Sequence, residues 1–144
     1  MFKRSFQLIS FACALAFLAF AQSDAAQTQV NPNSVTINSI KIGTSGTGCT
    51  AVETDCIDVQ WTTKSPINTA QLLYELSGTV NYESGSSNNS GTAVNNGAAT
   101  SAKVPFFHSG SGAVKVATIK LKLFQRGLNG AKKQLAESAK TQNF

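Results

Sequence analysis

The sequence has few of the residues on which catalytic and metal sites depend. It contains one histidine, His108, three cysteines and only 13% of charged residues. A zinc site takes four Cys, His or acidic ligands, and no Gly-x-Ser-x-Gly motif marks a serine nucleophile that His108 could serve. We therefore expect no catalytic residue, no metal and no cofactor, and a protein that is not an enzyme.

Arginine is scarce as well. Ten basic and seven acidic residues follow position 21, and Arg126 is the only arginine among them. The guanidinium group is the side chain best suited to bidentate phosphate contacts, so this mild excess of lysine does not amount to a nucleic-acid-binding surface. We expect no nucleic acid among the partners.

Long apolar runs are missing except at the N-terminus. Lys3 and Arg4 precede an almost wholly apolar run over 8–20, and small-x-small cleavage sites end at Ala21 and Ala25. This pattern is typical of a secretory signal peptide. The apolar run has about thirteen residues, whereas a bilayer span takes roughly 20. We predict a signal peptide at 1–21, cleaved as late as 25, and a secreted or periplasmic protein without a transmembrane segment.

A lipoprotein signal ending at Cys13 is the competing interpretation of the same leader. Ser10 stands where such signals usually have leucine, and apolar residues continue well past Cys13. Lipid attachment at Cys13 is therefore disfavoured.

Two cysteines remain after the leader, Cys49 and Cys56. An even number of cysteines in an exported chain indicates a disulfide. A redox-active pair would have its cysteines two residues apart at the start of a helix. We predict a structural Cys49–Cys56 bridge.

Alternation of apolar and polar residues marks the stretch 56–63 as a strand with one buried face. Ile57, Val59 and Trp61 alternate with polar residues, and a period of two is the strand signature. Trp61, the only tryptophan, brings a large apolar surface to this face. We expect these three residues to lie at the centre of the core.

Further strands are expected along the rest of the chain. The segment 34–42 changes its apolar parity, which predicts a bulge or a bend near Asn38 and Ser39. Leu72 and Tyr74 belong to a strand over 69–76, and another covers 102–107. The longest strand, 113–126, has Ile119, Leu121 and Leu123 on its core side, and its first part crosses to another partner or passes through a bulge.

The last segment follows a Gly127–Gly130 turn in which Asn-Gly supplies positive φ. We favour a returning strand over 131–141, although 131–139 is also rich in helix-forming residues. Residues 22–33 are predicted to be a disordered lead-in, and 34–144 one domain. Its stretch 83–101, made mostly of Ser, Asn, Gly, Ala and Thr, is predicted to be a flexible loop.

Many short strands, frequent turns and no convincing helix favour an all-β fold, a two-layer antiparallel β-sandwich. The segments 61–66 and 69–74 resemble the second and third strands of a fibronectin type III domain, and 113–126 with 131–141 resembles its last hairpin. The resemblance implies that Trp61 packs under Tyr74. An immunoglobulin-like sandwich of another lineage fits almost as well, and neither fold specifies a function.

Several exposed-looking side chains are candidates for binding. Lys120 and Lys122 share one side of the longest strand, and Lys132 and Lys133 return opposite it, which could form a basic face for an anionic glycan or a membrane. Lysines near strand edges also serve to block aggregation. For Tyr82, Phe106 and Phe107 two interpretations remain: they form a sugar-stacking surface, or they pack in the core.

The acidic residues Glu53, Asp55 and Asp58 lack the spacing of a calcium loop and are expected to form a solvated corner. The favoured function is a non-enzymatic binding or adhesion module that recognises an unknown cell-surface glycan or protein. The alternative is a pilus- or fibre-like subunit that assembles through strand edges, and a small hydrolase is the least favoured class.

Overall fold

The structure, a computed structural model, describes residues 30–43, 49, 54–107 and 111–144. The predicted signal peptide, Cys13, Glu53 and His108 lie outside the described residues. The described residues form seven strands and two short 3-10 turns: β1 (Ser34–Ile42), β2 (Thr54–Lys64), η1 (Thr69–Gln71), β3 (Leu72–Ser84), β4 (Ser86–Val94), β5 (Ser101–Phe107), β6 (Ser111–Arg126), η2 (Leu128–Gly130) and β7 (Lys132–Asn143).

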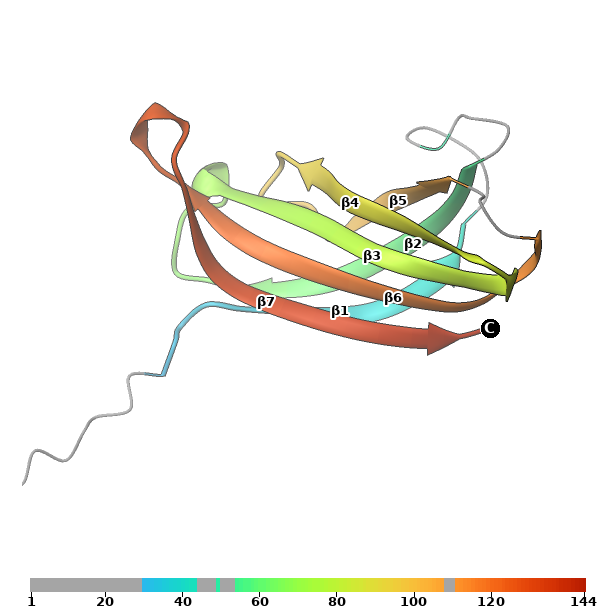
Figure 1. Ribbon diagram of the computed structural model, residues 1–144. Coiled ribbons are helices and arrows are strands. Elements are labelled where there is room, and N and C mark those ends of the chain that lie inside the picture. Colours follow the sequence, from blue (N-terminus) through green and yellow to red (C-terminus); the bar gives the residue numbers. More distant parts are fainter. Residues whose placement is uncertain (1–29, 44–48, 50–53, 108–110) are drawn as a thin grey trace, which may run out of the picture.

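The strands make two antiparallel sheets that face each other (Figure 1). One sheet has the order β1-β2-β5 and the other the order β4-β3-β6-β7. The predicted all-β, two-layer antiparallel sandwich is thus confirmed. It follows from the period-two pattern, which gives each strand one apolar face that only a second layer can cover.

The core lies between the two inner faces. All eight residues that the sequence placed there are at most 2% exposed: Ile57, Val59, Trp61, Leu72, Tyr74, Ile119, Leu121 and Leu123. The rings of Trp61 and Tyr74 have centroids 5.0 Å apart and an interplanar angle of 56°. This tilted contact joins β2 of one sheet to β3 of the other within the core.

Two bulges explain the changes of parity in the sequence. Ile37 pairs with Trp61 and Ser39 with Gln60, so Asn38 is the extra residue of β1. Two successive residues of β3 pair with Val116 and then with Val114, so β6 has one extra residue between these two valines. An inserted residue turns the following side chains to the other face, and both predicted irregularities are confirmed.

The C-terminal segment is a strand, as favoured. β7 pairs with β6 from Lys132 to Asn143, so the ladder of a long neighbouring strand outweighs the helix propensity of 131–139. The turn before it has Asn129 at φ 63° and Gly130 at φ 77°, the left-handed conformation that the Asn-Gly pair predicted.

The predicted flexible loop at 83–101 is wrong. Its residues Ser86–Val94 form β4, which pairs with β3 and is the edge of the larger sheet. Polar side chains hold it: Thr79 donates to Asn88 Oδ1 at 2.7 Å, and Asn89 donates to the carbonyl of Pro105 on β5 at 2.6 Å. Hydrogen bonds replace the apolar contacts whose absence from the sequence suggested a loop.

The last residues of the predicted disordered lead-in are tied to the sandwich. Asn31 donates to the carbonyl of Leu135 at 2.8 Å, and Ser65 donates to Asn33 Oδ1 at 2.6 Å. For residues 31–33 the prediction of disorder is therefore corrected, because short polar side chains supply the anchoring contacts.

The edge strands of the two sheets lie against each other. On one side, Ser138 Oγ of β7 accepts from the amide of Ile37 on β1 at 3.2 Å, and Lys140 donates to the carbonyl of Asn38. On the other side, Asn89 of β4 reaches β5. Each of these edge strands thus contacts an edge strand of the opposite sheet in addition to its neighbour in its own sheet.

Candidate functional site

The structure separates the four lysines that the sequence grouped together. Lys122 lies between Glu75 of β3 and Glu137 of β7 in the cross-strand register, and Lys120 lies beside Ala139. Lys132 and Lys133 pair instead with Arg126 and Gln125, several residues farther along the hairpin. The register thus offsets Lys132 and Lys133 from Lys120 and Lys122, and two carboxylates flank Lys122. The basic face of all four lysines stays a prediction.

A different cationic surface forms at the end of the β6–β7 hairpin. Every residue from Arg126 to Gln134 is exposed, and Figure 1 shows this turn at one end of the sandwich. The segment contains Arg126, Lys132 and Lys133 and no acidic residue. Leu128, at the turn, is 91% exposed. We call residues 126–134 the basic hairpin end.

Packing on the outer face supports the root of this hairpin. Leu73 of β3 pairs with Phe124 of β6 in the register, and Leu73 is only 2% exposed. The Lys132 Nζ lies 6.0 Å from the centroid of the Phe124 ring, within the range of a cation–π contact. The turn itself is closed by the amide of Gly127, which donates to the carbonyl of Ala131 at 2.7 Å.

A cavity of about 360 Å³ opens at the same end of the sandwich. Leu72, one of its walls, pairs with Gln125 immediately before the basic hairpin end. Its lining comes from three parts of the chain, the end of β2, the 65–74 segment and the 97–100 segment: Trp61, Thr62, Thr63, Ser65, Ile67, Thr69, Leu72, Tyr74, Gly97, Ala98, Ala99 and Thr100.

The wall of this cavity is held by the hydroxyl of Tyr74. It donates to the carbonyl of Gly97 at 2.9 Å, so the Thr63 hydroxyl, 3.0 Å away, donates to it in turn. Gly97 is required for this approach, because a Cβ there would lie 2.0 Å from the Thr69 carbonyl oxygen. Sequence reasoning missed the cavity, since residues 97–100 meet β2 and β3 only through the tertiary fold.

One buried polar atom of Trp61 is without a partner among the described residues. The indole Nε1 of Trp61 is buried and has no hydrogen-bond acceptor within the described part of the chain. Leaving a buried donor unsatisfied costs about 1–3 kcal/mol.

The aromatic residues proposed for sugar stacking lie elsewhere. Tyr82 is 5% exposed and Phe106 is fully buried, whereas Phe107 is 74% exposed. Tyr82 and Phe106 are members of the core cluster. A stacking surface made of the three residues is therefore excluded, because Phe106 and Phe107 are neighbours on β5 and point to opposite faces.

At the predicted acidic corner, the Asp58 side chain is 42% exposed and also has a cationic partner. Lys103 of β5 donates to Asp58 of β2 at 2.8 Å, and the carboxylate of Asp55 acts electrostatically on the phenol of Tyr82. Within the ranges that the structure describes, no group of three or more Cys, His, Asp or Glu side chains is arranged to hold a metal ion.

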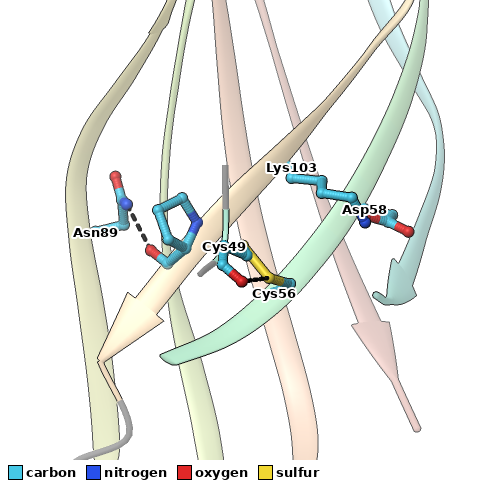
Figure 2. Close-up of a disulfide and its surroundings, with 6 residues drawn as sticks. Cys49, Cys56, Asp58, Asn89 and Lys103 are labelled. Carbon is cyan, nitrogen blue, oxygen red and sulfur yellow. Dashed lines mark hydrogen bonds and ion pairs between the residues drawn. A yellow bond between two sulfur atoms is a disulfide. The ribbon is translucent and has the colours of Figure 1, made fainter. Parts of the chain in front are cut away.

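The disulfide lies near this ion pair (Figure 2). Cys49 and Cys56 are bonded, as predicted, with their Cα atoms 5.9 Å apart, and they are 1% and 3% exposed. Cys56 pairs with Pro105 and Asp58 with Lys103, so the bridge covers the outer face of the smaller sheet. It lies on the half of β2 away from the cavity.

The buried phenol of Tyr82 predicts a loss of stability at alkaline pH. Burial, and then the hydrogen bond to Asp55, raises the pKa of Tyr82 well above its usual value. The unfolded chain loses this proton near pH 10 while the folded protein retains it. Stability that is present below about pH 10 is therefore lost above it, by up to about 1.4 kcal/mol per pH unit.

Urea unfolding of the parent protein and of Tyr82→Phe, measured from about pH 9 to about pH 11.5, tests this expectation. The variant should lose about 1 kcal/mol at neutral pH with its hydrogen bond. Above pH 10 its stability should fall less steeply than that of the parent. Parallel slopes would show that Tyr82 does not govern the alkaline transition.

The fold places this chain in the class of disulfide-containing all-β sandwiches. Comparison with family models, with curated proteins and with solved structures gives no significant match to this chain. None of the described residues forms a helix long and apolar enough to cross a membrane.

Proposed function

We propose that this chain is a secreted or periplasmic, non-enzymatic adhesion module that binds an anionic cell-surface glycan through the basic hairpin end. The observation that carries the proposal is the run of exposed residues from Arg126 to Gln134, with three cations, no carboxylate and an exposed Leu128. The disulfide supports the location, since such bridges form in oxidising compartments.

Electrostatics favour this hairpin over the rest of the surface. Lys122 faces Glu75 and Glu137 across the strands, Lys103 pairs with Asp58, and Lys115 pairs with Glu83 at 3.0 Å. The cations of the hairpin end have no acidic neighbour within their own segment. Asn129 adds an amide group that can bond to sugar hydroxyls, which favours a glycan over a lipid surface, whereas the Gln134 amide donates to Glu137 Oε2 at 3.1 Å.

We further propose that the sandwich is of the fibronectin type III kind. The contact between Trp61 and Tyr74 and the final β6–β7 hairpin are the features that the resemblance implied, and both support this assignment. The fibre-like subunit is the less supported function. It needs an accessible strand edge, and β1 lies against β7 while β4 is bonded to β5.

Retention on immobilised heparin, as an anionic glycan probe, tests the proposed surface. Lys132→Ala/Lys133→Ala should weaken binding about 5- to 30-fold, at roughly 0.5–1 kcal/mol for each exposed charge contact. Lys41→Ala/Lys120→Ala removes the same charge outside the hairpin and should leave binding within about twofold.

Equal losses in the two double variants would mean that heparin responds only to net charge, and the assignment to this hairpin would be wrong. Retention on vesicles of phosphatidylglycerol and phosphatidylcholine without retention on heparin would replace the glycan by a lipid surface. Circular dichroism of each variant establishes that the fold is intact.

A further inference from the structure

The chain contains two Asn-Gly pairs, Asn96–Gly97 and Asn129–Gly130. In such a pair the backbone nitrogen of the glycine can attack the side-chain amide of the asparagine, because glycine has no Cβ to hinder the approach. The attack requires that the side chain and the following backbone amide rotate toward each other. The folded structure therefore decides which of the two pairs reacts.

The first pair is held on both sides of its peptide bond. Asn96 Oδ1 accepts from the amide of Ala98 at 3.0 Å, and the Asn96 carbonyl accepts from the amide of Ala99 at 3.0 Å. Gly97 is buried, and its carbonyl accepts from the Tyr74 hydroxyl at 2.9 Å. Rotation about this peptide bond would break these hydrogen bonds, so we expect the fold to protect Asn96.

The second pair has no such restraint on its side chain. Asn129 and Gly130 are exposed at the turn of the basic hairpin end, and the Asn129 side chain has no hydrogen bond within the described part of the chain. A Cβ built on Gly130 would meet no atom within 4 Å. Asn129 has φ 63° and ψ 24°, so the turn has to rotate before the nitrogen reaches Cγ. Exposed turns open at little free-energy cost.

We propose that Asn129 is a site of spontaneous deamidation, which places a carboxylate in the basic hairpin end. The Gly130 nitrogen loses its proton and bonds to Asn129 Cγ, and the Cγ–Nδ2 bond breaks as ammonia leaves with that proton. Water, the only co-reactant, then opens the succinimide ring. Opening at Cγ gives aspartate, and opening at the backbone carbonyl carbon gives isoaspartate.

Both products change the basic hairpin end, which has three cations and no acidic residue. Isoaspartate also adds a methylene to the backbone of the turn that the Gly127–Ala131 hydrogen bond closes. The effect on binding rests on the proposed function: one added negative charge should weaken binding to an anionic glycan about 2- to 5-fold, as expected for one exposed charge contact. Binding through this hairpin thus declines as the protein ages.

Peptide mapping by mass spectrometry, after incubation at mildly alkaline pH and physiological temperature, tests the modification. Each conversion exchanges an amide NH₂ for OH, and chromatography separates the aspartyl and isoaspartyl peptides. In the folded protein, Asn129 should convert at least about tenfold faster than Asn96, a factor that one or two net hydrogen bonds supply. In urea both pairs are free and should convert at similar rates, which provides the internal control.

A charge-mimicking variant tests the effect on binding. Asn129→Asp carries the charge of the product and should reduce the affinity for immobilised heparin about 2- to 5-fold. Asn143→Asp is the matched control, because Asn143 is exposed and pairs with Val116, far from the turn along the β6–β7 ladder. It should leave binding within about twofold.

The proposal is overturned if Asn129 stays unconverted in the folded protein while both pairs convert in urea, or if Asn96 converts as fast as Asn129 in the folded protein. Its effect on binding is overturned if Asn129→Asp binds heparin as the parent does. If the parent does not bind heparin, the proposed function and the effect on binding both fail, and the peptide map alone decides the deamidation of Asn129.

Discussion

Replacing Trp61 by alanine is expected to lower the free energy of unfolding by about 3–5 kcal/mol, as for other buried large aromatic residues. Trp61 is 2% exposed, and its ring contacts Tyr74 of the facing sheet at a centroid distance of 5.0 Å. Its removal leaves a void between the sheets and takes away the partner of Tyr74. Since domains have about 5–15 kcal/mol of stability in total, the variant should be partly unfolded at physiological temperature.

Denaturant unfolding followed by far-ultraviolet circular dichroism measures this loss without relying on tryptophan fluorescence. Trp61→Phe retains an aromatic ring and should lose markedly less. Leu128→Ala removes a large apolar side chain that is 91% exposed and should change stability by less than about 0.5 kcal/mol. A loss below about 1 kcal/mol in Trp61→Ala would show that this residue does not anchor the two sheets.

The centre of the fold was predictable from the sequence because local pattern and tertiary packing agree there. The alternation around Trp61 places three side chains on one face, and all three are buried. The parity change near Asn38 predicted a bulge, which the register contains. Where apolar side chains do the packing, their spacing along the chain reveals the strand.

β4 was not predictable by the same route. Its positions facing β3 carry Ser87, Asn88 and Asn89, and the backbone ladder to β3 and side-chain hydrogen bonds attach it, with Val94 its one large apolar contact to the core. Such bonds leave no hydrophobic period in the sequence. A strand of small polar residues therefore has the composition of a loop, and only its neighbours make it a strand.

The basic hairpin end and the cavity also differ in how far the sequence could predict them. The turn of the basic hairpin end was visible in the Asn-Gly pair, but the register that separates Lys132 and Lys133 from Lys120 and Lys122 was not. A bulge lies between Leu123 and Phe124 in this pairing, and lysine spacing does not encode it. The cavity depends on Gly97 and Trp61, which lie far apart in the sequence and meet only after folding.

Removing the disulfide is the second change with a large expected effect. Cys49 and Cys56 are seven positions apart, and the chain-entropy estimate for so short a loop is about 2.5 kcal/mol. Cys49→Ala/Cys56→Ala should therefore unfold at a lower urea concentration, by about 2.5 kcal/mol at an unchanged denaturant slope. Reductant should destabilise the parent protein by a similar amount and the double variant not at all.

The position of the bridge makes this effect separable from binding. Cys56 pairs with Pro105 on the smaller sheet, whereas Trp61 and Leu72 of the cavity lie toward the opposite end with the basic hairpin end. Distant sites contribute independently to stability and binding. Below its unfolding transition, the double variant should bind heparin as the parent does. If stability falls and binding falls with it, the bridge organises the whole sandwich rather than the outer face of one sheet.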